Sequence, residues 1–542
     1  MKTPTAIFQR LLKNRGLNDD FLKPRYEDLS DPFLLPDIEL CIDRIQTAIQ
    51  KQEKIVIYGD YDVDGVCASV VMRDALVHAG CQDQNITILL PDRFIEGYGM
   101  NTSAIPLITN AAARLVITVD CGSGSEKVIA QLKEQGIDVV VTDHHEISTP
   151  PKTAIAVVNP KRVKKSPFHD LAGVGVAFTV ARALNFRQNQ SHLDGQEKWL
   201  LDLVVIGTIC DSMPLVGENR TLAFWGLRVL AKTRRIGLQE LMKIAKINPS
   251  KLTAHAVSFQ IGPRLNASGR MESAHKSLEL LIADTRSSAF KLAKTLEEFN
   301  QERRKVQNNA IAEVEAIGIS DKPVIVVKGA WHEGVIGIIA GKLVERYQKP
   351  AFVLTEVEKG FLKGSGRSFG DFNLADCIAH CQNMLAKGGG HNYACGLTIA
   401  NDFFDQFITS VNDFYTSLNL KNQSRFLKVQ SDLAVDNFAD LSEDLFQDLQ
   451  LLEPYGEGNP EPIFATTAKL SAARILKEQH LALTVRDSAD RSFRLMGFFA
   501  PDQWFDLPEN ATLHLKFSIS LNDWNGNHRI EGRLVDLEII ID

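Results

Sequence analysis

The chain has 542 residues, a length that exceeds one ordinary hydrophobic core and predicts several domains. Its composition, with 44% hydrophobic and 23% charged residues, is typical of soluble globular proteins, and no apolar run reaches the roughly 18 residues of a membrane helix. The N-terminus lacks the apolar core of a signal peptide, so we expect a soluble, unexported protein, and the formal net charge of −7 argues against binding nucleic acid over the whole surface.

The first half of the chain alternates short strands with helices. The predicted strands are 54–58, 86–90, 114–120 and 139–143, with helices at 66–78 and 125–134 and further helical patterns to about residue 232. β-Branched runs of this length, alternating with helices, predict an α/β domain with a parallel sheet covered on both faces.

The second half predicts a connecting helix and two further domains. A charge-rich helical pattern over 287–316 is expected to tie two lobes together, and a second α/β set follows it. After about residue 425 short strands and the turn residues Asn525 and Gly526 predict a small barrel or sandwich. The predicted domains are 1–250 (N-terminal segment and first α/β domain), 251–320 (connecting segment), 321–422 (second α/β domain) and 423–542 (β-rich domain).

Acidic side chains follow three strands of the first predicted sheet. Because ligands bind beyond the carboxyl ends of parallel strands, these side chains are expected to converge. Converging carboxylates repel one another unless cations compensate them, and oxygen ligands with one or two imidazoles suit Mn²⁺ or Mg²⁺. The residues are Asp60, Asp62 and Asp64 after the first strand, Asp120 after the third, and Asp143, His144 and His145 after the fourth, with Asp211 at the end of a helical run.

A pair of such ions about 3.5–4 Å apart can activate a water and stabilise both the attacking and the leaving oxygen at phosphorus. Asp64 or Asp120 is the best candidate to bridge them. The alternative is that each acid is a turn residue or a helix cap, as aspartate often is. Three acidic strand ends in one sheet, one of them bearing a His-His pair, favour the metal site.

The motifs DYDVDG (60–65), VDCG (119–122) and TDHH (142–145), in this order, resemble the first three motifs of the DHH phosphoesterase superfamily. The resemblance implies contact of His145 with the scissile phosphate, and orientation of the histidines by Asp143. Many superfamily members have a histidine where this chain has Tyr58, which leaves open whether both metal sites fill without substrate. The metal ligands implied are Asp62, Asp64, Asp120, His144 and Asp211.

Two other segments carry residues suited to phosphate. A Gly/Pro-punctuated segment at 262–270, interpreted as a loop, contains Arg264, Asn266 and Arg270, although its arginines could instead pair with acids across the lobes. The segment 364–368 combines an arginine with hydroxyls, and the glycines before His391 allow a backbone to approach a ligand closely.

Eight motifs are spread over nearly the whole chain: DPFLLPDIELCIDRI (31–45), PDRFIEGYG (91–99), LAGVGVAF (171–178), GPRLNASGR (262–270), WHEGVIGIIAGKL (331–343), SGRS (365–368), GGGH (388–391) and LEPYGEGNPEPIF (452–464). Together they resemble the RecJ family of bacterial 5′→3′ exonucleases specific for single-stranded DNA. The resemblance implies a DHH domain, a DHHA1 domain across a cleft and an OB-like domain. It implies that Ser365, Arg367 and Arg93 hold the terminal 5′-phosphate and that Arg270 lies along the strand and excludes duplex.

The resemblance therefore implies hydrolysis of single-stranded DNA to 5′-mononucleotides in recombination and repair, alongside single-strand-binding protein and helicases. Hydrolysis of short RNA or cyclic dinucleotides, or an inactive DNA-binding replication subunit, are the alternatives. We expect a monomer, with one or two of the tail aromatics stacking on bases; these are Phe493, Phe498, Phe499, Trp504, Phe517 and Trp524.

The cysteines indicate a reducing compartment, and hence the cytoplasm. Eight cysteines are scattered along the chain without a C-x-x-C pair. Cys377, His380 and Cys381 could form a metal clip, but cysteines four residues apart on a helix more often belong to a packed face.

Overall fold

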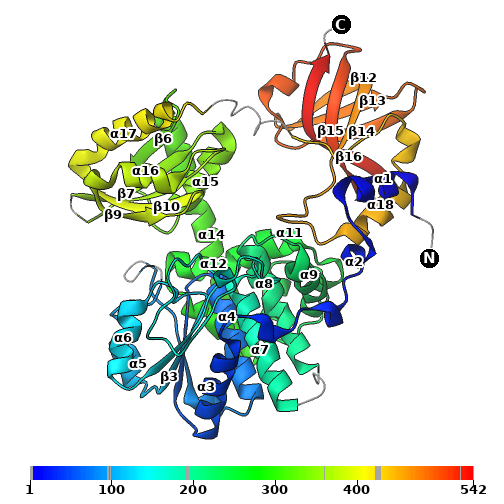
Figure 1. Ribbon diagram of the computed structural model, residues 1–542. Helices are drawn as coiled ribbons and strands as arrows, with labels where there is room; N and C mark the ends of the chain where they lie inside the picture. The colour runs from blue at the N-terminus through cyan, green and yellow to red at the C-terminus, as the bar shows by residue number, and fades with distance from the viewer. Residues whose placement is uncertain are drawn as a thin grey trace. The chain divides into compact units, whose positions relative to one another are not determined.

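The computed structural model describes residues 4–93, 97, 99–189, 195–358, 360–420, 429–524 and 527–540. The chain forms two compact units (Figure 1). The larger unit comprises Ser30–Met213 and Trp225–Leu427, and the smaller unit comprises Met1–Leu29, Pro214–Phe224 and Lys428–Asp542. No helix in the described ranges is both long and apolar enough to cross a membrane.

The first domain of the larger unit is built on a parallel five-stranded sheet of order β2-β1-β3-β4-β5. Both β1 and β3 are buried along their whole length, as expected for β-branched strands covered on both faces. The strands are β1 (Ile55–Gly59), β2 (Ile86–Leu89), β3 (Leu115–Val119), β4 (Asp138–Thr142) and β5 (Ala156–Val158), of which β5 was not predicted.

Helices cover both faces of this sheet (Figure 1). One face packs on α5 and α6 through residues such as Val116 and Ile129, and the other packs on α4 and α7. The helices of this region are α3 (Ile38–Gln50), α4 (Val63–His78), α5 (Ala104–Asn110), α6 (Glu126–Glu134), α7 (Gly173–Asn189), α8 (Leu201–Cys210) and α10 (Ile236–Ile244). The helix α9 (Gly217–Leu230) begins in the smaller unit and ends in the larger one.

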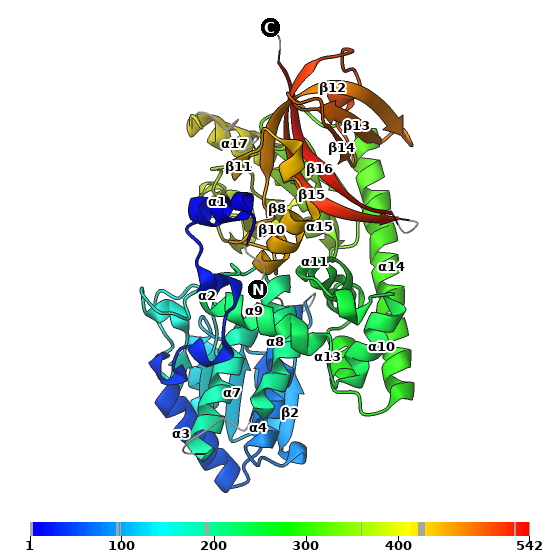
Figure 2. The same cartoon turned by 90° about the vertical axis from the view of Figure 1, so that its right-hand side faces the viewer.

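A helical segment leads from this domain to the next. The 32-residue helix α14 (Arg286–Ile317) confirms the predicted long helix and packs on α10, α12 and α13 (Figure 2). The interpretation of 262–270 as a loop was wrong, because these residues form most of α12, whose Pro263 occupies a first-turn position that tolerates proline. The other helices are α11 (Ala254–Ala256), α12 (Gly262–Met271) and α13 (His275–Leu281), with a π-helical stretch at Val257–Ile261.

The second α/β domain has a mixed sheet of order β6-β7-β8-β10-β9. The glycines at 388–390 lie in strand β9. Cys377 and Cys381 pack in the core of this domain, which confirms a packed helix face. Its elements are β6 (Ile325–Gly329), α15 (Ile336–Tyr347), β7 (Ala351–Glu358), β8 (Phe361–Arg367), α16 (Leu374–His380), β9 (Leu385–Gly390), β10 (Ala394–Ala400) and α17 (Phe404–Ser417).

The smaller unit is a closed barrel, as the prediction of an OB-like domain requires. The strand order is β11-β12-β13-β14-β16-β15, and pairing of β12 with β15 closes the sheet. Its elements are α1 (Ala6–Arg15), α2 (Asp19–Leu22), β11 (Leu433–Ala434), α18 (Glu443–Leu449), β12 (Phe464–Leu476), β13 (His480–Arg486), β14 (Ser492–Gly497), β15 (Thr512–Trp524) and β16 (Asn527–Ile540). The predicted turn at Asn525 and Gly526 lies outside the described residues.

The N-terminal helix belongs to this barrel, and not to the 1–250 domain that the sequence predicted. Ile7, Phe8 and Leu11 of α1 are buried in the barrel core, and α1 contacts α18. A short amphipathic helix has no sequence signal that names its partner, because any apolar surface can receive its buried face.

Candidate metal centre and adjoining cavity

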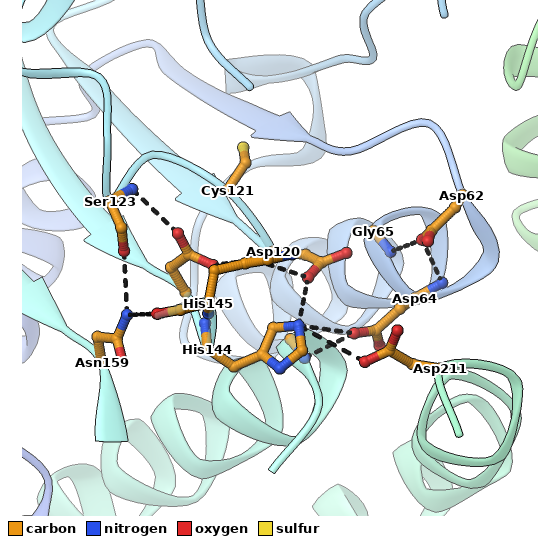
Figure 3. A network of polar contacts seen from close by, with 12 residues as sticks. Asp62, Asp64, Gly65, Asp120, Cys121, Ser123, His144, His145, Asn159 and Asp211 are labelled. Carbon is orange, nitrogen blue, oxygen red and sulfur yellow. Dashed lines mark hydrogen bonds and ion pairs between the residues drawn. The ribbon is translucent and has the colours of Figure 1, made fainter. Parts of the chain in front are cut away.

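The predicted acidic strand ends do converge (Figure 3). Asp60 follows β1 directly, Asp120 follows β3 and Asp143 follows β4, while Asp211 caps the C-terminus of α8. The Asp62 carboxylate caps α4, since its Oδ1 accepts hydrogen bonds from the backbone nitrogens of Asp64 (2.9 Å) and Gly65 (3.1 Å).

His144 is the focus of the cluster. Its Nε2 lies 3.1 Å from Asp120 Oδ1, 3.6 Å from Asp211 Oδ2 and 3.9 Å from Asp64 Oδ2. One ligand atom each from Asp64, His144 and Asp211 falls within 4.8 Å of the others, and so does one each from Asp120, His144 and His145. His144 and the three carboxylates around its Nε2 all belong to the predicted ligand set.

The electrostatics of these groups fit a divalent cation. Burial and the neighbouring Asp64 raise the pKa of Asp120 well above its usual value, and Asp120 Oδ1 is buried and accepts no hydrogen bond from the described residues. Burial and His145 lower the pKa of His144 to about 3, which leaves the neutral imidazole that a metal requires. Packed carboxylates with raised pKa values and an orphaned oxygen are expected where cations belong.

Asp143 holds both histidines through hydrogen bonds. Its Oδ2 accepts a hydrogen bond from the Ser123 nitrogen (3.0 Å), and its Oδ1 accepts from the backbone nitrogens of His144 (2.8 Å) and His145 (3.2 Å). The same Oδ1 lies 2.8 Å from Nδ1 of the His145 ring. Burial alone would lower the pKa of His145, but the hydrogen bond and charge of Asp143 reverse this and raise it to about 9.

Asn159 completes this support, and sequence reasoning missed it. Its Nδ2 donates to Ser123 Oγ (3.0 Å) and to the His145 carbonyl (3.0 Å), so it ties the end of β3 to the segment after β4 (Figure 3). A lone asparagine after an unpredicted three-residue strand carries no recognisable motif.

Asp60 was not among the predicted metal ligands, although the structure places it with them. Its side chain is buried, its Oδ1 accepts no hydrogen bond from the described residues, and one oxygen each from Asp60, Asp62 and Asp120 lie within 4.8 Å. The available signal was its position directly at a strand end, which it shares with Asp120.

A polar cavity of about 360 Å³ opens over the cluster. Arg93, Asn266, Arg270 and His391 line it together with Asp60, Asp62, Asp120, His145 and Asp211. The predicted phosphate-binding residues from α12, the segment after β2 and the segment after β9 therefore do meet the metal centre.

The remaining predicted phosphate contacts divide into two groups. Arg367 and Ser365 lie beside α15, and Arg367 is near enough to Arg270 to contribute to the lowering of its pKa, after burial, Arg93 and Arg303. Arg264 points elsewhere: its Nε lies 2.5 Å from Glu297 Oε2, and its Nη1 donates to the Gln260 carbonyl. That geometry favours the alternative of an arginine paired with an acid.

Mn²⁺ should stabilise the protein more at alkaline than at acidic pH. Burial and Asp62 raise the pKa of Asp64 to about 7, and burial and Asp64 raise that of Asp211 to about 8. A raised folded-state pKa means that the stability contributed below the ordinary carboxyl value is lost as the pH rises through the raised value. A bound cation compensates the charge of the ionised carboxylates and so prevents that loss of stability. Below the raised pKa values, protons compete with the cation for the same carboxylates. The increase in Tm at a fixed Mn²⁺ concentration should therefore grow between about pH 6 and about pH 8. An increase independent of pH would contradict this reading of the carboxylates.

The fold and the metal centre define a class: a DHH-type phosphoesterase. The family model for the N-terminal domain of the DHH family matches residues 54–208, that for the DHHA1 domain matches 321–417, and that for the RecJ OB domain matches 432–536. Single-stranded-DNA-specific exonuclease RecJ of Bacillus subtilis (strain 168) is 35% identical, over 99% of this chain and 68% of the relative. RecJ of Escherichia coli (strain K12) is 31% identical, over 99% of this chain and 95% of the relative. The chain belongs to the RecJ family.

Solved structures agree with this assignment. RecJ from Thermus thermophilus in complex with Mn²⁺ has a TM-score of 0.83 and 28% identity, covering 99% of this chain and 76% of that chain. The same protein in complex with Mg²⁺ has a TM-score of 0.78 and 26% identity, covering 98% and 74%. Both cations are ones that the ligand chemistry of this chain fits.

Proposed function

We propose that this chain is a 5′→3′ exonuclease that hydrolyses single-stranded DNA to 5′-mononucleotides in recombination and repair. The observation that carries the proposal is the single cavity in which buried carboxylates and histidines meet Arg93 and Arg270. A phosphodiester needs both: an acidic centre that holds cations, and cationic side chains that hold its negative charge.

The ligands we propose are carboxylates and one imidazole around two divalent ions, Mn²⁺ or Mg²⁺. When bound, the ions supply neutralisation of the phosphate charge and activation of a water. Asp120 belongs to two of the three groups of potential ligand atoms, so we assign it, ahead of Asp64, the position that would serve both ions. The ligands are Asp62, Asp64, Asp120, His144 and Asp211, with Asp60 added from the structure.

His145 is the residue we assign to the scissile phosphate. Asp143 occupies its Nδ1, so substrate contact falls to Nε2, on a ring that lines the cavity. The water oxygen attacks phosphorus in line and the bond to the 3′-oxygen breaks. His145 stabilises the phosphoryl oxygens and supplies a proton to the departing 3′-oxygen, which leaves a mononucleotide and a strand with a new 5′-phosphate.

The polarity follows from the anion contacts beside this centre. We assign the terminal 5′-phosphate to Ser365, Arg367 and Arg93, which donate to a phosphate as a set of fixed hydrogen bonds. Arg367 Nη1 already donates to Ser365 Oγ at 3.1 Å, so the two side chains are held together before substrate arrives. Asn266, Arg270 and His391 line the path of the strand.

The barrel of the smaller unit is the proposed track for the rest of the strand. Phe498 and Phe499 are 53% and 77% exposed, whereas Phe493, Trp504 and Phe517 are buried in the core. This pattern supports one or two stacking aromatics among the tail residues, with the side chain of Trp524 outside the described part. We further propose that the protein works as a monomer, together with single-strand-binding protein and repair helicases. Its eight free cysteines suit a reducing compartment, and we propose the cytoplasm.

The test is degradation of single-stranded DNA labelled at the 3′ end, in Mn²⁺, with 5′-phosphate, 5′-hydroxyl or blocked 5′ termini. Progressive shortening of strands with an open 5′ end, and none of blocked strands, is the expected result. Arg367→Gln should reduce the preference for a 5′-phosphate, while Arg346→Gln, an exposed arginine on α15, should leave it unchanged.

Other outcomes would replace the proposal. Shortening from the 3′ end would reverse the polarity. Release of mononucleotides from short RNA or cyclic dinucleotides, with intact DNA, would keep the metal chemistry and overturn the substrate. Binding of DNA without turnover in any divalent metal would indicate an inactive subunit.

A further inference from the structure

Arg303 of the long helix α14 is a buried cation that no carboxylate of the described residues contacts. Its side chain is 91% buried, with neutral partners only: Nη2 donates to Asn300 Oδ1 (3.0 Å) and Nη1 to Gln307 Oε1 (3.0 Å). The buried Nε–H has no acceptor among the described residues. A buried guanidinium is costly unless a negative charge compensates it.

The helix α12, which packs against α14, contains a buried arginine that does have a carboxylate partner. Arg264 of α12 is equally buried, and α14 supplies Glu297 to it at 2.5 Å. The same helix gives Arg303 no carboxylate within the described ranges. The two arginines therefore differ in whether a carboxylate of the chain compensates the buried charge. Arg264 has such a partner and forms a structural ion pair, whereas Arg303 has only neutral partners among the described residues.

Arg303 lines a small cavity of about 140 Å³. Ser258, Asn266 and Arg270 line it too, and none of its lining residues carries a carboxylate. Three of these residues, Cys210, Asn266 and Arg270, also line the cavity over the metal centre, so the two cavities adjoin.

Arg270, which borders both cavities, is likewise without a carboxylate partner among the described residues. Its Nη1 donates to the Gly334 carbonyl at 3.3 Å. Burial and the nearby Arg93, Arg303 and Arg367 lower its pKa to about 9, although Asp62 acts in the opposite direction. Neighbouring guanidinium groups repel one another, and an anion bound between them would offset the repulsion that Asp62 leaves.

We propose that this second cavity binds one internal backbone phosphate of the substrate strand, with Arg303 and Arg270 as its cationic contacts and Asn266 and Ser258 as its neutral donors. The inference rests on the proposed function, because it is the neighbouring metal cavity that makes the anion part of a DNA strand. A cavity of this size accommodates a phosphate group. A contact to a backbone phosphate would hold the strand in register without reading its sequence.

The test uses Arg303→Gln, with Arg304→Gln as the matched control, because Arg304 is the next residue of α14 and is exposed. Substrates are single strands in which one internal linkage at a time is a neutral methylphosphonate, and the measured quantity is the release rate of the first nucleotide. For the wild type, a neutral linkage at one internal position should raise KM about tenfold. Arg303→Gln should show the same rise in KM with normal DNA, and the neutral linkage at that position should raise its KM no further. Its kcat at saturation should stay within about twofold, and the slope of log affinity against log salt should fall by about one.

Three outcomes would overturn the site: a further rise in KM when the variant is given the neutral linkage at that same position, a loss confined to 5′-phosphate discrimination, or an unchanged KM of the variant with normal DNA. A second measurement, of Tm with and without inorganic phosphate, detects misfolding of the variant and does not depend on nuclease activity. Inorganic phosphate should raise the Tm of the wild type and of Arg304→Gln, but not that of Arg303→Gln, and without phosphate the variant should melt no lower than the wild type. If the wild type degrades no DNA and this difference persists, the proposed function falls while the anion site stands; if the difference is absent, the site falls.

Discussion

Asp120→Asn should lower kcat for DNA hydrolysis on the order of 10³-fold or more, with the fold intact. Asp120 belongs to two of the three ligand groups, and its Oδ1 lies 3.1 Å from His144 Nε2. Asparagine keeps the shape of the side chain but removes the negative charge of a residue that belongs to both groups, so charge neutralisation should fail in both metal positions. Calorimetric titration with Mn²⁺ should show weaker binding at both positions, alongside the loss of kcat.

The stability of this variant is the control for misfolding. Because burial and Asp64 raise the pKa of Asp120, its negative charge destabilises the metal-free fold, and Asp120→Asn should melt at or above the wild-type Tm without metal. Asp138→Asn, at the opposite end of β4 where the carboxylate pairs with Arg44, should leave kcat within about twofold of the wild type. An Asp120→Asn enzyme that keeps wild-type turnover would remove this residue from the metal centre.

The acidic centre could be predicted because each of its residues lies next to a strand or helix that the sequence pattern itself predicts. Each of Asp60, Asp120 and Asp143 directly follows a strand whose β-branched run is visible in the sequence, and parallel strands bring such positions to one edge. The motif spacing supplied Asp62 and Asp64, and Asp211 ended an apolar helix that was also visible. The sheet and the centre therefore came from short-range pattern and one topological rule.

What could not be predicted depends on contacts between distant segments. Glycines and Pro263 in 262–270 suggested a loop, but packing of α12 against α14 outweighs the weak helix propensity of those residues. The roles of Arg264 and Arg303 differ only because Glu297 reaches one and not the other, which no spacing rule states. Burial of α1 in the barrel is of the same kind, because its partner lies more than 400 residues away.

Gly207→Ala should disable the enzyme from a position that holds no reactive group. Gly207 lies in α8, and a Cβ there would come 2.5 Å from Asp64 Oδ1 and 2.6 Å from Val174 Cγ1. The Asp64 carboxylate is held by the backbone nitrogens of Gly173 (2.6 Å) and Val174 (3.0 Å), so it has little room to give way. We expect overpacking to lower the free energy of unfolding by about 1–3 kcal/mol.

The larger effect should be on catalysis, because displacing a metal ligand by even about 1 Å can reduce turnover roughly 10²-fold. Gly341→Ala is the matched control: it also lies inside a helix, α15, and its Cβ would meet no atom within 4 Å. It should keep its kcat and gain about 0.5–1 kcal/mol of stability, the usual result of replacing an unconstrained helical glycine. Urea unfolding and kcat measured on both variants separate the two causes. If Gly207→Ala lost stability but kept wild-type kcat and Mn²⁺ affinity, α8 would only pack against the centre; a joint loss of kcat and Mn²⁺ affinity means that the helix backbone fixes where Asp64 holds its ion.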